Sequence, residues 1–204
     1  MQYVLDYILS AILGAGLILI MNSANEIAAE NYSLYNGDMV VQEMLTQTAY
    51  LLEGELRNMG VGIPETKESV IWADSSGIGF LYDVNLDGTV DTVRYFAGTP
   101  GEMLQTMNEL DRPLYRRVND ENPMMVGAVT VFRLRYLTRT GAVLSTPVVT
   151  GQLSEIYSVD ITMEVQNPYA LSRPEGSVRT GERNALYSSS LWQQTRLSSQ
   201  NMRR

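Results

Sequence analysis

The sequence predicts an α+β protein in which one long N-terminal α-helix, apolar in its first half, packs on one antiparallel β-sheet and is followed by an extended C-terminal tail. Three observations support this: an apolar run near the start, a helical repeat of apolar residues after it, and strand-like alternation from Ser69 onward. These changes of pattern divide the chain into an apolar helix at 1–25, its amphipathic continuation at 26–60, an antiparallel β domain at 61–167 and a polar, arginine-rich tail at 168–204.

The first segment is apolar enough to cross a bilayer. Residues 7–21 contain no charged side chain, and the apolar run back to Tyr3 has only Asp6 inside it. About 20 apolar residues span the hydrocarbon core of a membrane. A carboxylate in that setting predicts a functional ion pair at Asp6, and the alternative is a hydrated position at the headgroup boundary. Gly14 and Gly16 would let helices approach closely, so we expect self-association through this segment.

The second segment continues the same helix with one apolar stripe. Its apolar residues recur at the helical spacings of three, four or seven: Val41, Leu45, Leu52, Leu56 and Met59. Because Gly60 is a typical stop signal, the helix is expected to run from about residue 2 to about residue 59, roughly 85 Å at 1.5 Å per residue. Asn22–Asn25 and Asn36–Gly37 have low helix propensity and are the points where it would unwind.

From Ser69 the apolar residues alternate as they do in β-strands. One sheet of about four or five strands is expected, at Ile78–Tyr82, Thr92–Phe96, Val129–Tyr136, Val143–Val149 and Tyr157–Val165. Residues 101–125 are expected to form a short helix and loops. Residues 166–204 are expected to form loops with at most a short last strand.

The loop between the first two of these strands carries the most specific local motif. It reads Asp83-Val-Asn85-Leu-Asp87-Gly-Thr-Val-Asp91, with oxygen side chains at alternate positions, a glycine and a closing carboxylate. This pattern fits a hard cation such as Ca²⁺, held by Asp83, Asn85, Asp87 and Asp91. An EF-hand would need glutamate at its twelfth position, where this chain has Arg94. The alternative is a tight hairpin in which these side chains make only turn hydrogen bonds.

Composition excludes several classes of enzyme and binding protein. Because the chain has no cysteine and no histidine, it cannot build a disulfide, a thiolate or histidine metal site, or a Ser-His-Asp triad. The formal net charge of −8 argues against nucleic acid as the main partner. A membrane-anchored hydrolase would need paired acids such as Glu53 and Glu55, or Asp83 and Asp87. Solvent or a cation explains both pairs better, so we expect no enzymatic activity.

The tail has the opposite charge to the rest of the chain. Residues 173–204 hold six arginines and two glutamates, whereas residues 1–172 hold nine basic and 21 acidic side chains. Such a segment is too polar to fold alone. We expect it to dock on an acidic surface of its own domain or of a neighbouring subunit, with Trp192 buried and arginines such as Arg196 paired to carboxylates. The alternative is a solvated tail.

The order of these segments resembles that of type IV pilins and pseudopilins, and in particular the PilW-like minor pilins. The stretches that carry the resemblance are Leu52–Gly60, Ile78–Phe96, Leu114–Arg117, Val126–Gly141 and Ile156–Val165. The basic leader of that family, which ends in Gly-Phe-Thr-Leu-Ile-Glu, is absent from this sequence. Asp6 would take the place of the family's glutamate at the fifth mature position if Met1 were removed.

The resemblance implies a structural subunit of an extracellular pilus-like filament. Such a subunit lies in the inner (cytoplasmic) membrane before assembly and at the cell surface afterwards, and its partners are copies of itself in a helical filament and other pilins. A second interpretation is a membrane-anchored minor pilin or pseudopilin, or a calcium-dependent tip adhesin, of a secretion or pilus machine. Uniform filaments of this one chain would support the first, and rare copies at the tip of another filament would support the second.

Overall fold

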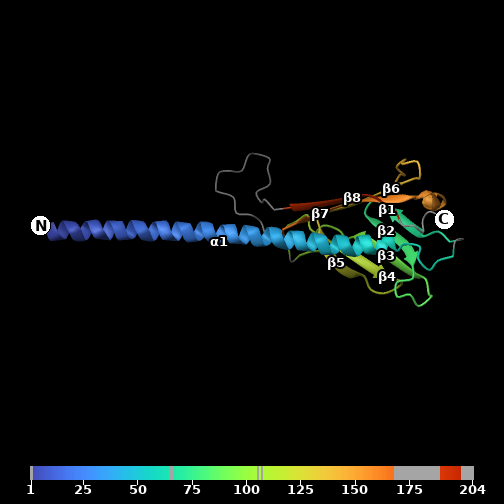
Figure 1. The fold of residues 1–204 in the computed structure, drawn as a ribbon, viewed down its shortest axis with the longest axis horizontal. Coiled ribbons are helices and arrows are strands. Elements are labelled where there is room, and N and C mark those ends of the chain that lie inside the picture. Colours follow the sequence, from blue (N-terminus) through green and yellow to red (C-terminus); the bar gives the residue numbers. More distant parts are fainter. Residues whose placement is uncertain (1, 65–66, 105, 107, 168–188, 199–204) are drawn as a thin grey trace. The chain divides into compact units, whose positions relative to one another are not determined.

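A computed structural model gives the fold of this chain (Figure 1) and describes residues 2–64, 67–104, 106, 108–167 and 189–198. The chain forms two compact units, Met1–Met39 and Val40–Arg204. Together they contain one long helix, eight β-strands and one short 3-10 helix in the described residues. The α+β prediction is therefore confirmed.

The long helix α1 extends over Gln2–Arg57. It is helical through both Asn22–Asn25 and Asn36–Gly37, the two points at which unwinding was expected. A turn ends the helix at Gly60, whose φ of +86° suits glycine. The Gly60 N–H donates to the carbonyl of Leu81 at 2.8 Å, which joins the end of the helix to the sheet. The predicted stop signal at Gly60 is confirmed.

The first sheet has five strands that pair in the order in which they occur along the chain. All neighbours are antiparallel, and the strands are β1 (Val70–Asp74), β2 (Gly77–Tyr82), β3 (Asp91–Ala97), β4 (Arg112–Val118) and β5 (Met124–Val129). The short helix expected within 101–125 is absent from the described residues of this range, and β4 and the start of β5 lie in its second half. Strand β4 was missed because a proline and three arginines mask its alternation.

The second sheet has three antiparallel strands, namely β6 (Val131–Leu137), β7 (Ser158–Gln166) and β8 (Ser189–Leu197). The chain passes from the first sheet to the second at Thr130, whose N–H donates to the Glu164 carbonyl at 2.9 Å. The strands thus form two sheets rather than the one expected. Strand β8, red in Figure 1, is nine residues long and not merely a short last strand.

The return strand expected at Val143–Val149 is absent from the described structure. Only an isolated bridge joins Val143 to Leu137. Strand β7, rather than Val143–Val149, is the antiparallel partner of β6 over the whole register from Val131 to Leu137. The Val148 N–H donates instead to the carbonyl of Ala73 in β1, at 2.9 Å. A 3-10 helix, Thr150–Glu155, leads into β7.

The core of the second unit lies between α1 and the two sheets. The predicted apolar stripe is confirmed, since all five of its side chains are buried in one cluster with β-strand residues. Leu52, Leu56 and Met59 are 0% exposed. Burying a side chain of this size stabilises the fold by about 1.5–3 kcal/mol, so the helix is an integral part of the β domain.

Candidate functional site

The apolar part of α1 is a candidate interaction surface. Tyr3–Ala29 is long and apolar enough to cross a membrane, and a signal sequence would satisfy the same criteria. None of this stretch is buried within the chain. Asp6 is exposed on it as well, with apolar neighbours that include Tyr3 and Ile8.

The two glycines of this stretch have open space around them. A Cβ added at Gly14 or at Gly16 would meet no atom within 4 Å. Residues two apart lie on nearly opposite sides of a helix, so the two glycines do not form one close-contact face. Gly14 instead shares a face with Ser10, four residues earlier, which gives a small-residue pair suited to close helix packing.

The acidic loop between β2 and β3 is closed by its own hydrogen bonds. Asp83 is 6% exposed. One of its carboxylate oxygens accepts from the N–H of Asp87 at 3.1 Å, and the other from the N–H of Gly88 at 2.8 Å. Asp87 accepts from the Asn85 side-chain amide at 2.8 Å and from the Thr89 N–H at 2.7 Å. These two bonds, the Asn85 amide first, lower the pKa of Asp87.

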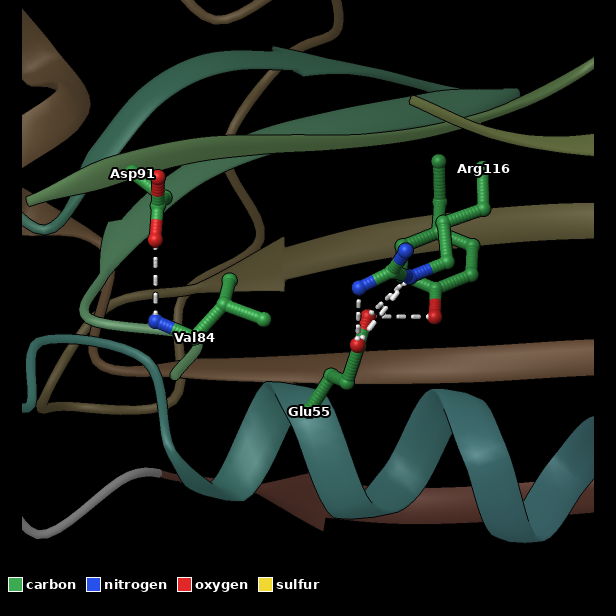
Figure 2. A network of polar contacts seen from close by, with 5 residues as sticks. Glu55, Val84, Asp91 and Arg116 are labelled. Atoms are coloured by element: carbon green, nitrogen blue, oxygen red, sulfur yellow. Dashed lines mark hydrogen bonds and ion pairs between the residues drawn. The ribbon is translucent and has the colours of Figure 1, made fainter. Parts of the chain in front are cut away.

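The fourth predicted ligand, Asp91, accepts hydrogen bonds that close the loop and connect it to a neighbouring strand. It accepts from the Val84 N–H at 3.1 Å, as Figure 2 shows. Its other oxygen accepts from the side-chain amide of Asn119 at 2.7 Å, which ties the loop to the end of β4. In the described residues no group of three or more acidic side chains is placed to hold a metal ion. The alternative of turn hydrogen bonds therefore accounts for each of the four side chains in this structure.

A polar network that the sequence did not reveal joins α1 to the first sheet (Figure 2). The Glu55 carboxylate accepts from two guanidinium nitrogens of Arg116, at 2.6 to 3.0 Å. It also accepts from the Tyr95 hydroxyl at 2.5 Å. The side chains of Glu55 and Arg116 are only 13% and 16% exposed. The expectation that Glu55 lies on a solvated helix surface is wrong, because Arg116 and Tyr95 face it across the interior.

Burial in this network changes the acidity of its members. Burial first, and then the charge and hydrogen bond of Glu55, raise the pKa values of Tyr82 and Tyr95 well above 10. The hydrogen bond with Glu55 raises the pKa of Arg116 despite its burial. The two phenols therefore stay protonated at neutral pH, and the network, through the ion pair of Glu55 with Arg116, fixes α1 on the sheet.

The predicted tail-docking residues lie in β8. Trp192 is opposite Met163 of β7 in the register, and the backbone of this part of the tail is paired into the second sheet. The side chains of Trp192 and Arg196 lie outside the described structure, as do residues 168–188 and 199–204. The docking prediction for these side chains stays a prediction.

Comparison of this chain with protein-family models, with curated proteins and with solved structures finds no match.

Proposed function

We propose that this chain is a structural subunit of a pilus-like filament, assembled through the apolar N-terminal part of α1. One observation carries the proposal: a single helix has an apolar stretch at Tyr3–Ala29 of which no part is buried, and its last turns are the core helix of the β domain. A domain that folds around the end of such a helix is anchored to whatever covers the rest of it. The long helix followed by antiparallel strands is also the plan implied by the pilin resemblance.

The apolar stretch needs a cover because its exposure to water is costly. Removing apolar surface from water gains about 25 cal/mol per Å², and large residues such as Leu9, Ile12 and Leu13 are more than half exposed here. A bilayer supplies this cover before assembly, and neighbouring copies of the helix supply it in the filament. The localisation proposed is the inner membrane first and the cell surface afterwards.

The Asp6 carboxylate is more easily accommodated in an assembled filament, where a neighbouring chain offers a cation, than in the hydrocarbon core of a membrane. An ionised carboxylate among apolar side chains needs a cationic partner, and the α-amino group of a neighbouring chain is the simplest one available. In the filament this pair would also set how far one subunit is displaced along its neighbour. A hydrated Asp6 at the headgroup boundary is the competing arrangement.

Electron microscopy of the purified full chain after removal of detergent tests the proposal. We expect uniform filaments from the wild type and a soluble, unassembled protein after deletion of residues 1–25. Polymers formed by the truncated protein would contradict the role of the apolar stretch. Copies found only at the tip of another filament would favour the minor-pilin interpretation.

Two matched substitutions refine the test. Asp6→Ala should reduce assembly strongly, because breaking a buried ion pair costs about 3–5 kcal/mol. Asp38→Ala is the control, since Asp38 is an exposed carboxylate of the same helix that lies outside the apolar stretch. Equal assembly of both variants would show that Asp6 stays hydrated.

A further inference from the structure

We infer that the outer face of the five-stranded sheet, opposite to α1, is a contact surface for a second copy of this chain. This inference rests on the proposed filament and names a second contact within it. The face is defined here by Trp72, Arg94, Phe96, Tyr115 and Arg117, and is called the aromatic–arginine face.

The strand register places these five residues on one side of the sheet. Trp72 of β1 is opposite Gly79 of β2, Gly79 is opposite Arg94 of β3, and Arg94 is opposite Arg117 of β4. Two residues further along, Phe96 is opposite Tyr115 in the same pair of strands, with ring centroids 5.4 Å apart. Cross-strand partners point to the same face of a sheet, so the five side chains form two adjoining rows.

The opposite side of the same strands is the interior. Val93 and Tyr95, which alternate with Arg94 and Phe96, are 0% exposed, and Tyr95 faces Glu55 of α1. The aromatic–arginine face therefore points away from the helix.

Two glycines, Gly77 and Gly79, leave the space that the Trp72 side chain occupies on this face. A Cβ on Gly77 would lie 2.3 Å from the outer edge of the Trp72 ring. A Cβ on Gly79 would touch Trp72, Ile71 and Arg94 at 3.4 Å. The Trp72 ring therefore lies flat against Gly77 and Gly79. Part of its surface is open to solvent, and Trp72 is 38% exposed. Flat aromatic rings beside arginines are the side chains most enriched at energetically important protein contacts.

The two arginines are an electrostatic cost to the isolated chain. Like charges directly opposite each other on neighbouring strands destabilise a sheet. Arg117 has an ion pair with Asp120 at 3.6 Å, but Asp120 is fully exposed and such pairs contribute little. Arg94 has no ion pair with any described residue. An acidic surface brought against this face would offset the repulsion.

A second copy of the chain is the partner that charge and composition favour. The chain has 23 acidic and 15 basic side chains, so the surface of every copy offers carboxylates in excess. A dense polyanion such as nucleic acid would be repelled by the net charge of −8. Both edges of the sheet add apolar contact area, since Ile71 at one edge is 36% and Met125 at the other is 47% exposed.

Reversing the charge of Arg94 tests the contact between copies without destabilising the fold. Arg94→Glu in the full chain places a carboxylate opposite Arg117, so the melting temperature should stay the same or rise. The same change should raise the critical concentration for assembly at least tenfold. Arg133→Glu is the control, because Arg133 is exposed on β6 of the other sheet. It should leave the critical concentration within twofold of the wild-type value.

Trp72 reports the same contact directly. In a Trp192→Phe background Trp72 is the only tryptophan, and its quenching by acrylamide should fall several-fold on assembly. Filaments of Arg94→Glu that form normally, with Trp72 still open to the quencher, would overturn this inference and leave the proposed function intact. Failure of the wild type to assemble in any condition would reject both proposals. Shielding of Trp72 in unassembled protein by hyaluronate, an anionic polysaccharide, would overturn the second copy as partner and assign the face to a glycan.

Discussion

Replacing Glu55 with alanine should destabilise the β domain far more than its position on a helix suggests. The carboxylate is 13% exposed, and it is the acceptor both for Arg116, itself 16% exposed, and for the hydroxyl of Tyr95. Removing one partner of a buried pair leaves the other charge without compensation, which costs about 3–5 kcal/mol. Because both groups keep slight contact with solvent, we expect a loss near the lower limit, about 3 kcal/mol.

Equilibrium urea unfolding of the full chain in detergent, followed by tryptophan fluorescence, measures this loss. The matched control is Glu53→Ala, two residues away on the same helix. Glu53 pairs with Arg57, whose side chain is 58% exposed, so its removal should cost about 0.3–0.5 kcal/mol. Replacing both members of the buried pair, Glu55→Leu with Arg116→Leu, should recover part of the stability. Equal effects of Glu55→Ala and Glu53→Ala would refute the assignment of the network as the attachment of α1 to the sheet.

Three further predictions concern the same domain. Gly127→Val should cost about 1–3 kcal/mol by overpacking, because a Cβ there would lie 2.6 Å from the Thr48 hydroxyl; a thermal melt checks this. Asp83→Ala should lower the melting temperature equally in calcium and in a chelator, since Asp83 closes the loop through two backbone N–H groups. A rise in the melting temperature of the wild type on addition of calcium, abolished by Asp87→Ala, would instead identify a metal site. The contribution of Tyr95 to stability should be fully present up to about pH 10 and be lost above it, because burial raises the pKa of Tyr95 above the unfolded value of 10.0 and the folded state retains the proton; a pH series of urea midpoints measures the decline.

Local patterns predicted the parts of the fold that depend on neighbouring residues. The apolar repeat from Val41 to Met59 and the stop at Gly60 follow from helix geometry alone, and both are found. The alternation from Val129 to Tyr136 likewise predicted β6, although β5 ends at Val129 and the chain changes sheets at Thr130. Alternation cannot show that change, because the pattern is the same in either sheet.

Contacts between residues far apart in the sequence cannot be predicted from local patterns. Glu55 and Arg116 are 61 residues apart, and each resembles an ordinary surface charge until strand pairing brings β4 over α1. Arg94 and Arg117 become neighbours only through the same register. For the acidic loop the sequence left a cation site and turn hydrogen bonds as alternatives, and only the structure shows which backbone N–H groups bond to its carboxylates.

Because strand β8 lies near the end of the chain, the core of the β domain is completed only late in synthesis. The helix stripe that begins at Val41 leaves the ribosome early, whereas Leu197, which is 2% exposed in the same core, follows on the order of ten seconds later at usual rates of translation. Throughout that interval the stripe has no completed domain to cover it, and β7 has an unpaired edge. Nascent chains held apart by membrane insertion of their first helix would meet one another less often than chains released into solution. Protection from premature association would thus come from the same segment that we propose as the assembly surface.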